Sequence, residues 1–289
     1  MKTPVWKMSR RRFLGGVSFA AAGTFGYARL FEAERLQVSH HTVPLAGGAR
    51  RPLKLLHLSD LHASGVVGLD YIESAFDRAL AWQPEVICLT GDFITQRFER
   101  ATDYARILKK LSDAAPCFAT LGNHDGGQWA GADGGYADIA WITQVLHDSR
   151  ITLLHNAALR WTADEWALRF VGLGDTWAAH FDPKKAFSAA RVESSASSEI
   201  PAIVLSQNPD TKDALAAHRW NLLLSGHTHG GQLRVPWLGA TPFAPVRDKR
   251  FVAGLHRWNE RWIHVTKGIG TVFGVRINCP PDISCLTLT

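Results

Sequence analysis

The sequence predicts an α/β fold, and three observations support this prediction. Short apolar runs, which are typical of buried strands, recur through residues 50–289. Several segments between these runs place apolar residues at helical spacing. Polar clusters follow the runs where the strands would end. Strands that alternate with helices form α/β folds, whose functional groups gather at the carboxyl ends of the strands.

The first half of this body alternates strand and helix three times. The predicted strands are Leu53–Leu58, Val86–Thr90 and Cys117–Leu121, and the predicted helices are residues 70–82, 100–112 and 136–148. The first helix rests on one apolar face, made by Ile72, Ala75, Phe76, Ala79 and Leu80. Residues 33–50 precede this series and are predicted to be a linker.

The second half repeats the alternation less regularly. The predicted strands are Leu168–Leu173, Ala202–Leu205, Leu222–Leu224, a segment near Trp262–Thr266 and another near Ile283–Leu288. A helix is expected to follow Asp210 and to end near Ala217. Residues 182–200 are rich in Ser and Ala and are predicted to form a solvated loop. No linker divides residues 50–289, so we expect a single domain there.

The net charge of +6 does not indicate a nucleic-acid-binding protein. Residues 1–28 hold five of the 32 basic residues and no acidic one, so 27 basic residues face 26 acidic ones in the remainder. The hydrophobic share of 46% excludes a disordered chain. Uncharged apolar runs of about 18 residues, which a polytopic membrane protein needs, do not occur.

The N-terminus has the layout of a twin-arginine export signal. Arg10, Arg11 and Arg12 come directly before the short apolar stretch Gly15–Tyr27. We therefore assign residues 1–40 to a signal peptide or membrane anchor with a linker, and we expect the export machinery as a partner. The protein would be periplasmic or extracytoplasmic, with anchoring to the inner membrane left open. Cleavage at Ala20–Ala22 or near Ala28 also stays open.

The four cysteines form no metal-binding pattern. Cys88 and Cys117 lie in apolar runs, where a thiol usually serves as a small buried side chain. Cys279 and Cys285 could pair in an oxidising compartment. The chain is large enough to fold without that disulfide, so we do not expect it.

Five predicted strand ends supply residues that suit metal binding. The candidate ligands are Asp60, His62, Asp92, Asn123, Gln207, His227 and His229. This mixture of carboxylates, imidazoles and amides suits Mn, Fe, Zn or Co, and it is too large for one tetrahedral ion. A centre of two ions polarises a phosphoryl group and supplies hydroxide near neutral pH. His124 is then free to assist the transition state or to protonate the leaving oxygen.

The ordered motifs resemble the calcineurin-like metallophosphoesterase superfamily over residues 50–289. The motifs are Asp60-x-His62, Gly91-Asp92, Gly122-Asn123-His124-Asp125 and Gly226-His227-Thr228-His229. Gly226–Gln232 and Arg276–Ile283 look like its branch of twin-arginine-exported bacterial phosphodiesterases. The resemblance implies a four-layer α/β/β/α sandwich of two mixed sheets, with residues 41–289 as the metallophosphoesterase domain.

The resemblance also assigns a role to each residue. Asp60, His62 and His229 would hold the first metal, Asp92 would bridge both metals, and Asn123 and His227 would hold the second. His124 would be the catalytic histidine, with Asp125 orienting it. The family tail suggests further that Arg276 could face a phosphate.

Two positions depart from related patterns. Gln207 stands where the family usually has a histidine, and an amide oxygen is a weaker ligand for Zn or Fe than an imidazole. The second site could therefore be weak, partly empty or selective for a harder ion such as Mn or Mg. Phe93, Ile94 and Thr95 follow Gly91-Asp92, which argues against the Ser/Thr protein phosphatase branch.

The sequence thus predicts an exported, metal-dependent phosphoesterase, most simply a phosphodiesterase. One alternative is a pyrophosphate hydrolase that acts on a nucleotide-activated lipid such as UDP-diacylglucosamine. Another is a non-catalytic metal- or ligand-binding module. We expect the loop that carries Trp129 to shape the substrate pocket, and His57 to be structural.

Overall fold

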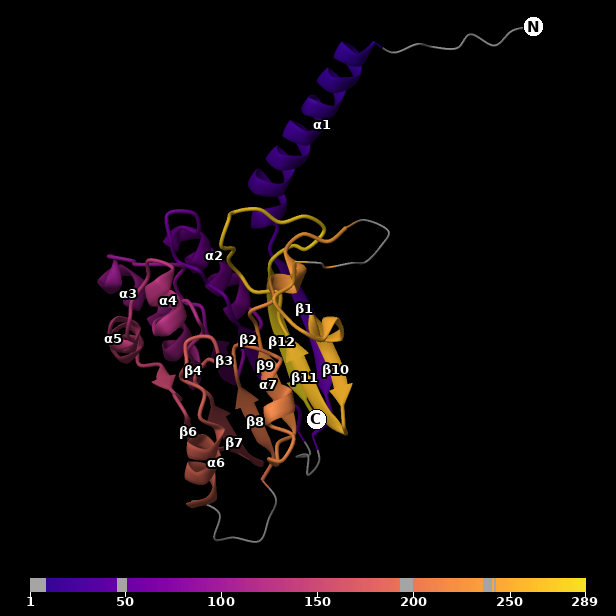
Figure 1. Ribbon diagram of the computed structural model, residues 1–289. Coiled ribbons are helices and arrows are strands. Elements are labelled where there is room, and N and C mark those ends of the chain that lie inside the picture. The colour runs from indigo at the N-terminus through magenta and orange to yellow at the C-terminus, as the bar shows by residue number, and fades with distance from the viewer. Residues whose placement is uncertain (1–8, 46–50, 193–199, 236–240, 242) are drawn as a thin grey trace, which may run out of the picture.

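The computed structural model describes residues 9–45, 51–192, 200–235, 241 and 243–289. A compact body follows the N-terminal helix α1 (Arg10–Leu30), which projects away from it (Figure 1). Ser9 caps α1 by accepting a hydrogen bond from the Arg12 amide. Among the described residues, no helix combines the length and apolarity needed to cross a membrane.

Twelve strands of the described chain form two six-stranded mixed sheets. The first sheet has the order β1 (Gln37–Val43), β12 (Asp282–Leu288), β2 (Leu53–Leu58), β3 (Val86–Thr90), β4 (Cys117–Thr120) and β5 (Thr152–Leu153). The second has the order β10 (Gly254–Trp258), β11 (Arg261–Val265), β9 (Leu222–Ser225), β8 (Ala202–Leu205), β7 (Trp166–Gly172) and β6 (Ala157–Ala163).

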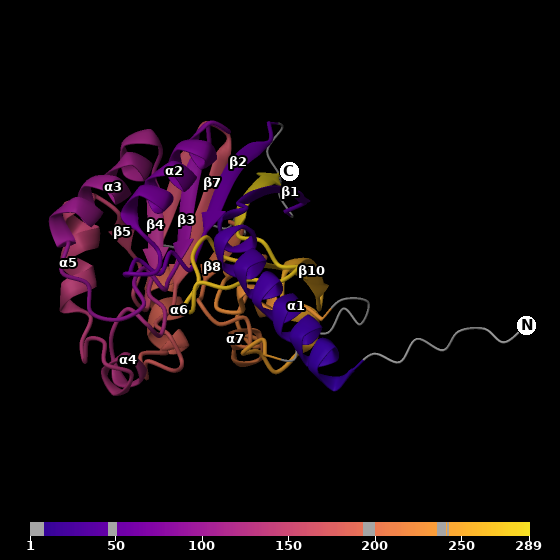
Figure 2. The same ribbon diagram turned by 90° about the horizontal axis from the view of Figure 1, so that it is seen from above.

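Helices cover the outer face of each sheet, which gives the predicted four layers (Figure 2). The first sheet is covered by α2 (Leu69–Leu80), α3 (Ala101–Ala114) and α5 (Ala140–Asp148), and the second by α6 (Pro183–Val192) and α7 (Thr211–Ala214). The short helix α4 (Gln128–Ala132) and the 3-10 turns η1 (Glu32–Glu34), η2 (His229–Gly231) and η3 (Lys249–Phe251) lie in the connections.

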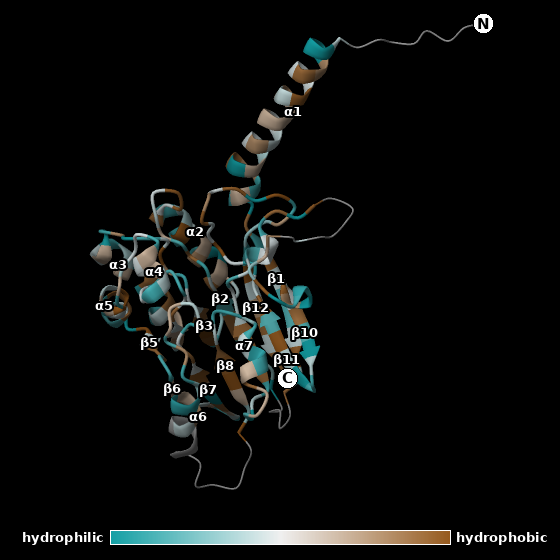
Figure 3. Cartoon of the chain, viewed as in Figure 1, coloured by the Kyte–Doolittle hydropathy of each residue, from teal (hydrophilic) through white to brown (hydrophobic). Residues whose placement is uncertain are grey.

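The alternation of side chains along each strand builds the core. Leu55 of β2 and Phe170 of β7 face each other's sheet and belong to the layer between the sheets. Leu56 of β2 points the opposite way, against the buried face of α2 that includes Phe76. Because the central strands are buried on both faces, they are predominantly hydrophobic (Figure 3).

The structure confirms the predicted central strands and corrects two other expectations. The bounds of Leu53–Leu58, Val86–Thr90 and Ala202–Leu205 agree with the prediction. The predicted linker 33–50 contains β1, which pairs in parallel with β12, so the expected boundary at residue 40 falls inside a strand. The predicted loop 182–200 contains α6, whose Phe187 stacks on His218, while residues 193–199 lie outside the described part. All four cysteines are free, so Cys279 and Cys285 do not pair.

The topology brings the predicted ligands to one edge. Strands β2, β3 and β4 run parallel in the first sheet, and β7, β8 and β9 run parallel in the second. The residues that follow the carboxyl ends of these strands therefore meet where the two sheets lie side by side.

Candidate metal centre

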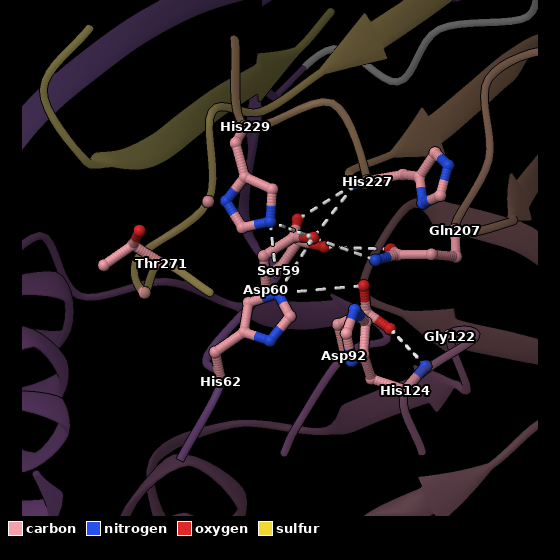
Figure 4. A network of polar contacts seen from close by, with 12 residues as sticks. Ser59, Asp60, His62, Asp92, Gly122, His124, Gln207, His227, His229 and Thr271 are labelled. Carbon is pink, nitrogen blue, oxygen red and sulfur yellow. Dashed lines mark hydrogen bonds and ion pairs between the residues drawn. The ribbon is translucent and has the colours of Figure 1, made fainter. Parts of the chain in front are cut away.

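The backbone turns sharply at the predicted ligands. Asp60, His62, Asp92, His227 and His229 all have φ between 49° and 68°, in the left-handed region that non-glycine residues rarely adopt. Such conformations persist where the surrounding structure enforces them, and they cluster at functional sites. The five side chains that these turns present lie close together (Figure 4).

One group of three side chains is arranged to hold a cation. Asp60, His62 and His229 place one ligand atom each within 4.8 Å of the others, and all three residues are buried (Figure 4). The Nε2 atoms of His62 and His229 are 3.1 Å apart, and His229 Nε2 lies 3.5 Å from Asp60 Oδ1. These are the residues predicted to hold the first metal.

A second group shares His62 with the first. Asp92 and His124 complete it, and the Asp92 carboxylate lies 3.8 Å from His62 Nε2 through Oδ2. Asn123 Oδ1 and His227 Nε2 are buried atoms that have no hydrogen-bond partner. Buried polar atoms without partners are costly, and a bound cation would satisfy both. The residues present therefore fit a metal centre of the predicted kind.

Gln207 lies beside the first group and is already engaged. Its amide Nε2 donates to Asp60 Oδ1 at 2.9 Å, and its Oε1 accepts from Ser59 Oγ at 3.1 Å (Figure 4). The side chain therefore orients a predicted metal ligand in this structure. Direct coordination by Gln207 stays a prediction.

The imidazole of His124 is oriented by a backbone carbonyl and not by the carboxylate of its neighbour Asp125. His124 Nδ1 lies 2.7 Å from the carbonyl oxygen of Thr95, which can only accept, so Nδ1 carries the proton. The Asp125 carboxylate instead accepts from the backbone amides of Gly122 and Phe93 at 2.8 and 2.7 Å. Asp125 thus fixes the turn that presents His124, and Thr95 orients the imidazole.

Arg276 does not face the substrate pocket, which corrects the expectation from the family tail. Its side chain is fully buried. The guanidinium donates to carbonyl oxygens of His229, Lys267, Gly268, Gly270 and Cys279, and it lies 3.4 Å from His229 Nδ1. Arg276 therefore fixes the backbone around His229, which is a predicted ligand.

Burial controls the protonation of the centre. Burial raises the pKa of Asp60 to about 6, and that of Asp92 well above its usual range. Burial also lowers the pKa of His227 to about 3 and those of His62 and His229 well below the usual range. A divalent cation favours ionised carboxylates and neutral imidazoles, so it would offset the cost of burying the two acids.

Comparison with known proteins decides the family. The model of the calcineurin-like phosphoesterase family matches residues 53–231, which is more than half of the chain. The chain belongs to this family. It is a hydrolase that acts on phosphoric ester bonds.

Curated relatives extend this likeness over nearly the whole chain. Phosphodiesterase YaeI of Escherichia coli (strain K12) is 36% identical over 97% of this chain and 99% of its own length. The uncharacterized metallophosphoesterase YkuE of Bacillus subtilis (strain 168) is 27% identical over 98% of both chains. UDP-2,3-diacylglucosamine pyrophosphatase LpxG of Chlamydia muridarum (strain MoPn / Nigg) is 26% identical over 80% of this chain and 82% of its own.

A pocket of about 390 Å³ opens beside the centre of this phosphoesterase. The predicted ligands Asp92, Asn123, His227 and His229 line it together with His124, and the remaining wall is mainly apolar. Trp129 lies edge-on to His124, with ring centroids 4.3 Å apart. The loop after the His124 motif therefore shapes the pocket, as we expected.

Three notable residues at or near the site were absent from the predicted set. Thr95 binds His124 through its backbone carbonyl, which no side-chain motif could reveal, and its hydroxyl lies 3.2 Å from His62 Nδ1. Trp177 lies edge-on to His227 at 4.5 Å. Asp175 follows β7, is buried and keeps one carboxylate oxygen without a partner. A signal for Asp175 existed, because Gly174-Asp175 follows an apolar run as Gly91-Asp92 does.

Proposed function

We propose that this phosphoesterase is an exported phosphodiesterase with two divalent ions. The carrying observation is that Asp60, His62 and His229 meet Asp92 and His124 beside a largely apolar pocket, which Asp92, His124 and His229 line. Asp60, His62 and His229 would hold one ion, Asn123 and His227 would hold the other, and Asp92 would contribute to both. Mn, Fe, Zn, Co and Mg are the candidates. When bound, the ions would polarise the phosphoryl group of the substrate and supply a nucleophile near neutral pH.

The pocket favours a diester over a monoester. Its described lining contains no Lys or Arg. A monoester dianion carries more negative charge than a diester, so it would need such a side chain more. Trp129, Trp177, Val272 and Phe273 offer apolar surface to a second substituent on phosphorus. The relative YaeI, described as a phosphodiesterase, supports the same choice.

Residues of the protein itself position the proton that the leaving oxygen needs. Because Nδ1 of His124 donates to the Thr95 carbonyl, Nε2 is the atom that can hold a proton for the leaving oxygen. Trp129 restricts the access of water to that histidine from one side. Gln207 keeps Asp60 oriented.

The sequence of the N-terminus supports export and membrane association. Arg10–Arg12 and the apolar stretch that follows resemble a twin-arginine signal, and the helix α1 that contains them projects from the body. We infer an extracytoplasmic location, with the export machinery as a partner. Localising a tagged full-length chain after cell fractionation, in hosts with and without the twin-arginine translocase, tests this inference.

The activity is tested with metal-free protein reloaded with one ion at a time. A chromogenic diester and the matching monoester are assayed side by side, with Asp92→Asn as the control. Metal-dependent turnover of the diester that the control lacks would support the proposal. Faster turnover of the monoester would contradict it.

A second candidate is hydrolysis of a pyrophosphate bond in a nucleotide-activated lipid. The exposed aromatic side chains of Phe243 and Phe273 at the rim favour it, because they could contact acyl chains. The relative LpxG, described as a UDP-2,3-diacylglucosamine pyrophosphatase, points the same way. Turnover of that lipid nucleotide in detergent, without turnover of simple diesters, would favour this candidate.

A further inference from the structure

The last turn of α1 is fixed to the loop 271–276. The Ala28 carbonyl accepts a hydrogen bond from the Arg276 amide at 3.1 Å. The Arg29 guanidinium donates to the carbonyls of Phe273 and Gly274 at 3.4 and 3.5 Å. Ala28 is the one buried residue of α1, so the helix meets the body at this end.

The loop fits this contact closely. Gly274 has a φ of +71°, and a Cβ at that position would lie 2.0 Å from Arg29 Nη1. Glu32, buried just after α1, accepts from the Tyr27 hydroxyl at 2.7 Å and pairs with Arg35. The last turn of α1 is therefore held by loop 271–276 on the body and by Glu32, which follows the helix.

The same loop serves the catalytic centre. Val272, Phe273 and Val275 line the pocket beside the metal centre. Arg276 ends the loop, and its side chain holds the segment of His229. A continuous set of contacts thus runs from the Ala28 carbonyl, through the backbone and side chain of Arg276, to a predicted metal ligand.

We propose that the end of the leader helix, residues 27–32, is a positioning element of the enzyme: it sets the pocket wall formed by loop 271–276. Export signals are commonly discarded, but this end of α1 belongs to the folded body (Figures 1 and 3). Cleavage at Ala20–Ala22 would preserve these contacts, whereas cleavage after Ala28 would remove the carbonyl that binds Arg276. The inference concerning the substrate rests on the proposed phosphodiesterase function.

The test uses the full chain and begins with hydrogen–deuterium exchange, which needs no substrate. Arg29→Ala is compared with Arg12→Ala, which removes the same side chain at the exposed opposite end of α1. We expect Arg29→Ala to speed exchange of the hydrogen-bonded amides of Arg276 and Ile277 at least tenfold, and Arg12→Ala to leave it unchanged. Arg29→Lys should restore part of the protection. Unchanged exchange in Arg29→Ala would overturn the inference.

Kinetics then test the link to the pocket. With a bis-aryl phosphodiester, Arg29→Ala should raise KM about three- to tenfold and change kcat less than twofold, because the wall binds substrate while the ligands stay in place. Gly274→Ala should act in the same direction, and Gly65→Ala, where an added methyl meets nothing, should have no effect. An unchanged KM with faster exchange would refute the role in substrate binding. The wild type could also fail to cleave any diester while Arg29→Ala still speeds amide exchange. That result would support the contact and contradict the proposed function.

Discussion

His62 and His229 present their Nε2 atoms to each other at 3.1 Å, although 167 residues separate them in sequence. Two imidazole nitrogens this close cannot both carry a proton. Their pKa values are both depressed by burial, so both rings are neutral at physiological pH. Asp60 lies beside the pair and supplies the negative charge that a cation would need.

We therefore predict that divalent ions stabilise the fold through this pair. Metal at about 100 times its Kd should add about 2.7 kcal/mol, which corresponds to a rise in Tm of several degrees. Differential scanning calorimetry with and without a chelator measures it. His229→Ala should abolish the rise, whereas His147→Ala, at an exposed histidine, should keep it. A rise that persists in His229→Ala would place the ion elsewhere.

The sequence predicted the centre of the fold better than its edges. Central strands such as β3 and β8 are buried on both faces, so they appear as continuous apolar runs. The four strands without a prediction, β1, β5, β6 and β10, are the edges of the two sheets. An edge strand is partly solvated and needs fewer apolar residues, as the polar sequence of Gln37–Val43 shows.

The candidate site, like the fold, was predictable from the sequence only in part. Asp60 and His229 were predictable because each follows an apolar strand at the same edge of its sheet. The orienting roles of Thr95 and Arg276 were not predictable, because both depend on contacts that form only on folding. Chain order therefore reveals the ligands, and tertiary structure reveals what orients them.

His124 should matter for rate more than for metal binding. His124→Ala removes the proton held next to the leaving oxygen, so kcat should fall by about 10²- to 10⁴-fold. The metal-dependent rise in Tm should remain within about twofold of the wild type. Steady-state kinetics and calorimetry on one preparation check both expectations. Loss of the thermal shift would instead make His124 a ligand, which its place beside His62 and Asp92 allows.

Gln207 should set which ion is preferred. Gln207→His replaces an amide with an imidazole, so the ratio of Zn affinity to Mn affinity should rise at least tenfold. Competition titrations with a metal-sensitive dye measure this ratio. Gln207→Asn keeps the amide chemistry on a shorter side chain and serves as the control. If neither variant changes the ratio, Gln207 only orients Asp60.

Acid should destabilise the fold through a buried histidine pair away from the centre. His57 Nδ1 and His264 Nδ1 are 2.9 Å apart, and His57 Nε2 lies 2.9 Å from Thr90 Oγ1. Burial lowers the pKa of His57 to about 3, and that of His264 well below its usual range. The unfolded chain binds these protons near pH 6.5, so the stability present above pH 6.5 is lost as the pH falls toward 3.

A single variant isolates this contribution. His57→Gln can still bond to both neighbours but cannot titrate, so the loss between pH 6.5 and 3 should lessen by up to about 1.4 kcal/mol per pH unit. Urea unfolding at several pH values provides the slope. An unchanged slope would show that His57 is not responsible.

Arg276 should prove important to the centre although it does not line the pocket. Its guanidinium donates hydrogen bonds to five backbone carbonyls and is fully buried. No other type of amino-acid side chain carries the same planar fork of donors. Arg276→Met removes a donor from each of these carbonyls, although those of His229 and Gly268 still accept from the amides of Gln232 and Asp282, and it should cost about 3–5 kcal/mol of folding free energy. Arg276→Lys keeps the charge but loses the fork, so it should fold more stably than Arg276→Met and still bind metal more weakly than the wild type. Urea unfolding and metal titration of the two variants separate these effects. Equal metal affinity in Arg276→Lys and the wild type would mean that charge alone holds His229 in place.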